Sequence, residues 1–250
     1  MISNSTEISD SNFENRNVLK GKQSFTESQI VYEDNHLLVI NKRAGQLVQG
    51  DKTGDRSLLE LIKDFLKVRD NKAGNVFLGL VHRIDRPTSG LVIYAKTSKA
   101  LSRLTQMVKN REITKTYWAI VPKEMIPQSQ NLTHYLQKNE KNNKAIVYIR
   151  PTEGAKEAKL SYEVLKMLDN YQLLEINLET GRHHQIRAQL AKIGVPVKGD
   201  LKYGAPRSNA DGGISLHARN LQFIHPVSKD EITVTAPVPD DALWKSAEQQ

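Results

Sequence analysis

The residue in this sequence best suited to chemistry is an aspartate flanked by two arginines. Asp85 lies between Arg83 and Arg86 in the stretch HRIDRPTSGLVIYAKT, which covers residues 82–97. Nearby opposite charge favours the ionised form of a carboxyl group, so Asp85 suits the role of a nucleophile or a base better than that of a general acid. A structural ion pair or a side chain that caps the turn is the alternative, because aspartate is common in turns.

The residues after Asp85 predict a rigid support for it. Residues 87–90 (PTSG) indicate a turn, and the apolar run 91–95 (LVIYA) is short and rich in β-branched and aromatic side chains, which is typical of a buried strand. Asp85 is therefore expected on a tight, positively charged loop that leads into a core strand. Loops held by a rigid scaffold often carry reactive groups.

The rest of the chain mixes strand and helix patterns. Residues 30–42 indicate a hairpin, and Ser57 with Glu60 forms a capping box at the start of a helix. Further helices are predicted over 98–109 and 184–193. Strand patterns recur at 115–121, 145–149, 160–165, 173–178 and within 214–236. Without a βαβα rhythm, this mixture favours an α+β fold with a mixed, mostly antiparallel sheet flanked by helices and loops.

Two parts of the chain differ in composition. Residues 1–27 are polar and rich in Ser and Asn, which predicts a disordered or loosely docked tail. Residues 28–250 have a length that suits a single domain. The N-terminus does not have the basic segment followed by an apolar segment that is typical of a secretory signal, and no apolar run is long enough to span a bilayer. We therefore expect a cytoplasmic protein. A monomer is the default expectation.

The overall charge is basic and the chain has no cysteine. Lys and Arg total 36 against 28 Asp and Glu, a net charge of +8, which fits a partner that carries phosphates. The absence of cysteine excludes disulfides and thiolate metal sites. The seven histidines form no ligand motif, and the adjacent His183 and His184 are expected to point to different sides of a helix, so no metal site is predicted.

The stretch 82–97 closely resembles the signature of the RluA-type family of RNA pseudouridine synthases, with Ile84 where leucine is usual. Four further groups of residues resemble the family's other motifs in the same order: 115–119 (KTYWA), 178–187 (LETGRHHQIR), 194–204 (GVPVKGDLKYG), and a closing set at 216–218, 223–226 and 236–239. The resemblance extends over nearly the whole chain. His183 fills a variable position of the second group.

The resemblance implies a pseudouridine synthase catalytic fold and the isomerisation of uridine in rRNA or tRNA. The N1–C1′ bond breaks, the base turns, and C5 joins C1′, so no cofactor is implied. By resemblance, Asp85 is the catalytic carboxylate, Arg187 is the arginine that pairs with it, and Tyr117 is the tyrosine that can pack on the uracil. It stays open whether Asp85 attacks the ring, attacks C1′ or abstracts a sugar proton.

The resemblance also suggests how RNA is bound. A target base must leave its stack before the reaction, and by resemblance Arg83 contacts the RNA at that point or binds a phosphate. His82 and Arg182 complete the predicted RNA-binding set, and a stem-loop is the expected partner because its bases are easily extracted. The short tail is too small for the extra RNA-binding domain that many family members carry, so that domain is expected to be absent.

Two other functions are compatible with parts of this sequence. An RNA N-glycoside hydrolase would cut the same bond and use a second carboxylate to activate water, for which Glu179 and Asp200 are the candidates. For Asp200, a turn or capping role is the preferred interpretation. A non-catalytic RNA-binding or ribosome-assembly protein fits the positive charge equally well, but it would not need Asp85, Tyr117 and Arg187 together.

Overall fold

The structure, a computed structural model, describes residues 24–51 and 53–249. Residues 1–23 of the predicted tail therefore lie outside the described residues. At the start of the described chain, Phe25 packs edge-to-face against Phe65, with ring centroids 5.2 Å apart. The short 3-10 helix η3 (Glu27–Gln29) follows and leads into the first strand.

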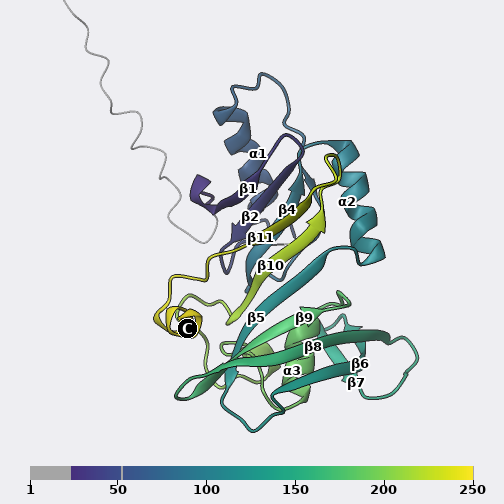
Figure 1. Cartoon of the computed structure of the whole chain (residues 1–250), viewed down its shortest axis with the longest axis vertical. Coiled ribbons are helices and arrows are strands. Elements are labelled where there is room, and N and C mark those ends of the chain that lie inside the picture. Colours follow the sequence, from purple (N-terminus) through teal and green to yellow (C-terminus); the bar gives the residue numbers. More distant parts are fainter. Residues whose placement is uncertain (1–23, 52, 250) are drawn as a thin grey trace, which may run out of the picture.

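One large mixed sheet runs through the described part of the chain (Figure 1). Its strands are β1 (Ile30–Glu33), β2 (Leu37–Lys42), β3 (Gly79–Leu80), β4 (Ser89–Ala95), β5 (Thr114–Pro122), β6 (Ser129–Asn139), β7 (Lys144–Tyr148), β8 (Lys156–Met167), β9 (Tyr171–Leu178), β10 (Leu216–Ile224) and β11 (Glu231–Thr235). The order is β1-β2-β4-β10-β5-β9-β8-β6-β7, with β11 beside β10 and β3 beside β4. Among these strands only β4 and β10 pair in parallel, which confirms the predicted α+β fold.

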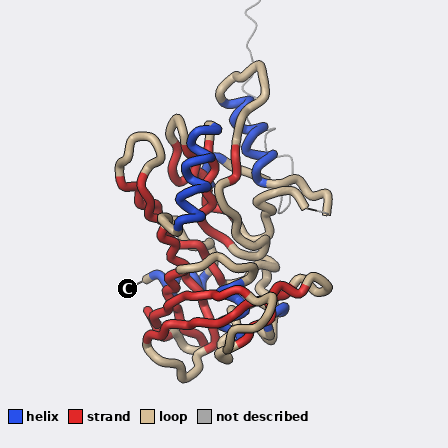
Figure 2. The backbone as a smooth tube through the Cα atoms, turned by 90° about the vertical axis from the view of Figure 1, so that its right-hand side faces the viewer, coloured by secondary structure: helices blue, strands red, loops and turns tan. Residues whose placement is uncertain are grey.

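The helices cover different parts of this sheet. They are α1 (Leu58–Arg69), α2 (Ser98–Asn110), α3 (Gln185–Lys192) and α4 (Ala242–Glu248). Figure 1 shows α1 and α2 beside the half that contains β1, β2, β4 and β10, whereas α3 lies with β6 to β9. Figure 2 shows that loops gather along one side of the molecule where the two halves meet. Within the described residues no helix is both long and apolar enough to cross a bilayer.

The predicted start of α1 is confirmed in its hydrogen bonds. The Ser57 hydroxyl accepts from the N–H of Glu60, and the Glu60 carboxylate accepts from the N–H of Ser57 at 2.7 Å, so two free donors of the first turn are satisfied. The helix then buries Leu58, Ile62 and Leu66 against the sheet. The predicted 30–42 hairpin is also present as the antiparallel pair β1 and β2.

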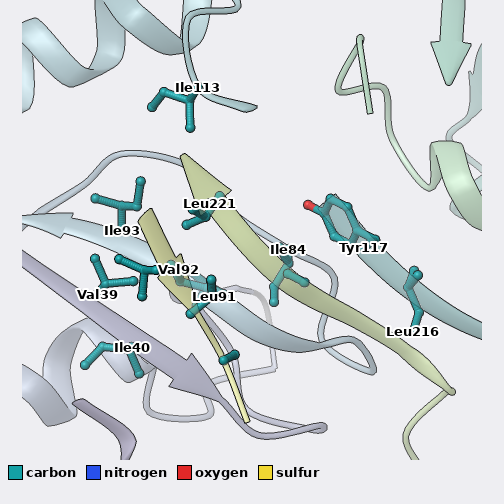
Figure 3. Packing of buried hydrophobic residues seen from close by; sticks show 14 of the residues in the cluster. Val39, Ile40, Ile84, Leu91, Val92, Ile93, Ile113, Tyr117, Leu216 and Leu221 are labelled. Carbon is teal, nitrogen blue, oxygen red and sulfur yellow. The ribbon is translucent and has the colours of Figure 1, made fainter. Parts of the chain in front are cut away.

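Strand β4 is the centre of the core and the support of the Asp85 loop. All seven of its residues are buried, between β2 on one side and β10 on the other. Figure 3 shows Leu91, Val92 and Ile93 packed among side chains of β2 and β10. A buried strand of this kind holds the loop before it rigidly, because burial on both faces fixes its register.

Candidate active site

The Asp85 loop opens into a cavity of about 770 Å³ between the two halves of the sheet. Its walls come from residues 81–88, from the end of α2 and the start of β5, and from the segment that joins β9 to α3. All six residues predicted for the site line this one cavity: His82, Arg83, Asp85, Tyr117, Arg182 and Arg187. Residues that are far apart in the sequence are thus brought together around a single space.

Arg187 lies between two carboxylates. Its Nη1 donates to Asp85 Oδ2 at 2.9 Å, while Nε and Nη2 donate to the two oxygens of Asp200 at 2.6 and 2.9 Å. Burial alone would lower the pKa of Arg187, but the hydrogen bonds and charge of Asp200 and Asp85 outweigh burial and raise it. Arg187 therefore stays charged and holds Asp85 in one orientation.

The charges next to Asp85 in the sequence do not pair with it. Arg86 turns away and donates to Asp55 at 2.5 Å and to the carbonyl of Gly45 at 3.1 Å. Arg83 is exposed and forms no hydrogen bond or ion pair with any described residue. The expectation that these two guanidiniums flank the carboxylate is corrected: the cation that touches Asp85 is Arg187.

Asp200 also differs from its expected role. It precedes the short 3-10 helix η4 (Leu201–Tyr203), but its side chain makes no capping hydrogen bond there. It is 1% exposed and both of its oxygens accept from Arg187. The turn part of the prediction is confirmed, because the Asp200 carbonyl accepts from the N–H of Tyr203 at 3.0 Å. A capping role of its side chain is wrong. A fully buried carboxylate needs a buried cation as partner, and only the fold places Arg187 beside it.

Tyr117 comes from β5 and lines the cavity near Asp85. Burial, together with the negative charge of Asp85, raises the pKa of its hydroxyl, so the group stays protonated at neutral pH. That hydroxyl has no hydrogen-bond partner among the described residues, and Figure 3 shows its ring near Ile84 at the edge of the core. The ring can pack on a base while the hydroxyl donates a hydrogen bond.

The prediction that His183 and His184 point to different sides of a helix is wrong. Their rings stack at a centroid distance of 3.8 Å and an angle of 24°, and α3 begins only at Gln185. His184 Nε2 lies 3.7 Å from Asp85 Oδ2. The resemblance had drawn attention to the motif, but the role of His184 beside the carboxylate was not predicted.

The cavity lining is strongly basic. Besides Arg187 it contains Arg83, Lys109, Arg111, Lys115 and Arg182, against two acids, Asp85 and Glu179. Within the described ranges none of these five cations forms a salt bridge. Uncompensated positive charge in a cleft attracts an anionic ligand such as a phosphate chain.

The three predicted RNA-binding residues differ in exposure, in hydrogen bonding and in charge. Arg83 is exposed, and Arg182 is anchored by its Nε, which donates to the carbonyl of Glu157 at 2.8 Å. His82 Nε2 accepts from the N–H of Ile93 at 3.3 Å. Burial, and then the charge of Lys115, lower the pKa of His82 to about 3, so His82 brings no positive charge to the cavity at neutral pH.

Among the described residues, possible metal ligands do not gather into a site. Across 24–51 and 53–249, no group of three or more His, Cys, Asp or Glu side chains is arranged to hold a metal ion. The groups that Asp85, Tyr117 and Arg187 bring to the basic cavity are a carboxylate, a phenol and a guanidinium.

The mixed α+β sheet carries a basic cavity around a carboxylate, a lining that suits an anionic ligand. The model of the RNA pseudouridylate synthase family matches residues 36–192. The chain belongs to this family.

Individual relatives agree with this assignment. An uncharacterized RNA pseudouridine synthase of Synechocystis sp. is 37% identical over 84% of this chain, and the ribosomal large subunit pseudouridine synthase C of Vibrio cholerae is 34% identical over 84%. This chain spans 65% of the length of each. The human RNA pseudouridylate synthase domain containing 4 shares the fold, with a TM-score of 0.71, 24% identity, and coverage of 85% of this chain and 89% of that one.

Proposed function

We propose that the protein isomerises uridine to pseudouridine in a structured RNA, with Asp85 as the catalytic carboxylate. The observation that carries this proposal is the contact between Asp85 and Arg187 inside the basic cavity that Tyr117 also lines. Membership of the family supports the same reaction.

Each of the three side chains has a role in this reaction. Arg187 holds Oδ2 of Asp85, and no described residue hydrogen-bonds to Oδ1, so Oδ1 is the oxygen presented to the nucleotide. Tyr117 packs on the uracil and keeps the detached base in place while it turns. Because the reaction only exchanges an N1–C1′ bond for a C5–C1′ bond, no atom and no electron has to be supplied from outside.

The unpaired cations around the cavity would hold the RNA. Arg83 and Arg182 from the predicted RNA-binding set, together with the cations from α2 and β5, present positive charge toward the cavity. They suit the phosphates of a strand that leads a flipped nucleotide to Asp85. His82 would serve the loop by its contact to β4 and would not contact phosphate as a cation.

Ribosomal RNA is the substrate we propose to test first. Relatives of this chain are named ribosomal large subunit pseudouridine synthases C and D, and transfer RNA is the alternative substrate. The cytoplasmic location and the monomeric state stay predictions.

The competing hydrolase loses one of its two candidate carboxylates. Asp200 is buried and bound at both oxygens by Arg187, so it is not free to activate water. Glu179 lies at the cavity lining and is the remaining candidate. Release of free uracil from the RNA would identify a hydrolase, whereas a synthase retains the base.

The proposal can be tested by mapping pseudouridines in total RNA from cells with and without the gene. We expect at least one site to disappear, and to return with the wild-type protein but not with Asp85→Ala. If Asp85→Ala restores the site, the catalytic role of Asp85 is refuted. If no site changes in any RNA pool, a non-catalytic RNA-binding protein becomes the better explanation.

A further inference from the structure

His184 has a left-handed backbone conformation, which is uncommon for residues other than glycine. Its φ is 52°, in the left-handed region, at the residue just before α3. Such a conformation in a non-glycine residue is unfavourable and persists where surrounding contacts impose it, often at functional sites. The ring is buried, stacks on His183, and meets the ring of Tyr203 edge-on at a centroid distance of 5.6 Å.

The hydrogen bonds around Tyr203 determine where the proton of His184 lies. The Tyr203 oxygen accepts from the N–H of Ala145 at 2.7 Å and lies 2.9 Å from His184 Nδ1. If that oxygen also accepted from His184, the tyrosine proton would have no acceptor among the described residues. Donation from the hydroxyl to Nδ1 is the arrangement that pairs the tyrosine proton within the protein. In a neutral imidazole one nitrogen accepts and the other donates, so this arrangement puts the proton of His184 on Nε2.

The donor nitrogen faces the carboxylate. Nε2 lies 3.7 Å from Asp85 Oδ2, the oxygen that Arg187 Nη1 already contacts at 2.9 Å. Both donors thus converge on one oxygen, and Oδ1 is left to the substrate. At 3.7 Å this is a contact and not yet a hydrogen bond. In unliganded enzymes, contacts between catalytic groups are often long and shorten when the substrate is bound.

The ring is neutral at physiological pH. Burial lowers the pKa of His184 to about 3, against the opposing effect of Asp85, and the charges of Arg187, His183 and Lys202 add to the lowering. His184 is therefore not a proton source for the reaction. Its contribution is a fixed N–H group.

We propose that His184 is a positioning residue. Directed by Tyr203, its Nε2–H group holds Asp85 Oδ2 together with Arg187, so that Oδ1 is aimed at the target nucleotide. This inference rests on the proposed function, because it concerns how the same carboxylate is aimed.

The proton position can be measured directly by ¹⁵N NMR of the histidine rings in the full-length protein. The His184 signals are identified by their loss in His184→Asn. We expect a neutral ring with the proton on Nε2 at neutral pH, and a larger share of the Nδ1–H form in Tyr203→Phe, which lacks the directing hydroxyl. A proton on Nδ1 in the wild type, or a charged ring at neutral pH, would overturn the proposal.

Two substitutions separate the Nε2 donor from the rest of the side chain. Asparagine tolerates left-handed backbone and keeps an acceptor near Nδ1, but it does not reach Asp85. Glutamine places an N–H group near the Nε2 position. On an RNA stem-loop that the wild type modifies, we expect His184→Asn to lower kcat by about tenfold to a hundredfold with KM nearly unchanged, and His184→Gln to recover most of the loss.

A matched control uses another histidine. His36→Asn, in the turn between β1 and β2, lies outside the cavity lining and is expected to leave kcat unchanged. All three variants must keep the wild-type unfolding midpoint. Wild-type kcat in His184→Asn, or no recovery in His184→Gln, would refute the positioning role. If the wild type modifies no RNA, the proposed function fails, and the NMR result alone then decides the inference on His184.

Discussion

At the scale of single residues, the site depends on how two carboxylates share one guanidinium. Arg187 is 4% exposed and would be a costly isolated charge in the interior. Asp200 compensates that charge with two hydrogen bonds, while Asp85 takes one and keeps an oxygen free. Asp200 is therefore the structural partner of Arg187, and Asp85 is the partner that keeps an oxygen free for the proposed reaction.

The first prediction concerns Asp200→Ala. It leaves Arg187 buried with only Asp85 as a counter-charge, so we expect the free energy of unfolding to fall by about 3 kcal/mol. The same change should reduce activity, because Arg187 is no longer held in place. Urea unfolding measures the first effect. The control is Asp64→Ala, which removes the exposed ion pair to Arg56 and should cost less than about 1 kcal/mol. Equal costs in both variants would contradict this account.

Sequence reasoning identified the residues of the site better than their contacts. The stretch around Asp85 predicted a reactive carboxylate, but local charge suggested Arg83 and Arg86 as its partners. The actual partner, Arg187, is 102 positions away, and only the family resemblance pointed to it. The role of Asp200 was missed, because an aspartate after a glycine has the pattern of a turn residue.

At the scale of elements, the junction of β4 and β10 positions the Asp85 loop. Gly90 pairs with Ala218 in the parallel ladder and has a φ of 108°. A Cβ atom added at Gly90 would lie 2.3 Å from the carbonyl oxygen of Ala218. Only glycine permits both this backbone conformation and this approach.

The second prediction is therefore that Gly90→Ala destabilises the protein and impairs activity. Pushing β10 away from β4 would move the loop that carries Asp85, and overpacking in a core typically costs about 1–3 kcal/mol. Thermal unfolding and pseudouridine formation measure the two effects. Gly74→Ala is the matched control, since nothing lies within 4 Å of its added Cβ. A wild-type melting temperature in Gly90→Ala would show that the junction is not tightly packed.

The third prediction uses His217 at the same junction. Its side chain is fully buried, its Nδ1 lies 2.9 Å from the Ser89 hydroxyl, and burial, with the nearby charge of Arg219, lowers its pKa from 6.5 to about 3. The unfolded chain thus binds a proton between these values that the folded protein does not bind. Folding stability should therefore fall as the pH drops below 6.5, by about 2 kcal/mol for this group at pH 5.

The variant His217→Asn tests that contribution. Asparagine can still bond to Ser89 but does not titrate in this range, so the loss of stability from pH 7 to pH 5 should be smaller than in the wild type by about 2 kcal/mol. Denaturant unfolding at both pH values gives the comparison. Identical pH dependence in the two proteins would show that the pKa of His217 is the same in the folded and the unfolded state.

Local patterning predicted most elements but not their arrangement. The first hairpin, α1, α2 and the strands β5, β7, β8 and β9 follow from hydrophobic periodicity and capping. Strand β6 was not predicted, because it is rich in polar residues and only its alternate positions Leu132, His134 and Leu136 are buried. The parallel pairing of β4 with β10 joins segments more than 120 residues apart, and no local signal encodes it.

At the scale of the whole molecule, the chain has a net charge of +8, and part of its positive charge lies around the cavity. Unpaired cations line the cavity, whereas many surface cations form salt bridges, such as Arg69 with Glu33 and Lys245 with Asp240. The wall built by the end of α2 contributes Lys109 and Arg111. If this wall holds the phosphates of the RNA, its charge should act on binding and leave the reacting groups untouched.

The last prediction is that Lys109→Ala and Arg111→Ala weaken RNA binding in a salt-dependent way. Each phosphate contact that is lost should reduce the slope of log affinity against log salt concentration by about 0.7 to 0.9. Binding of a stem-loop RNA at several salt concentrations measures that slope, and saturating RNA should restore the wild-type kcat. Lys99→Ala is the control, because Lys99 is exposed at the other end of the same helix and does not line the cavity. Equal slopes for all three variants would place the RNA backbone on another wall of the cavity.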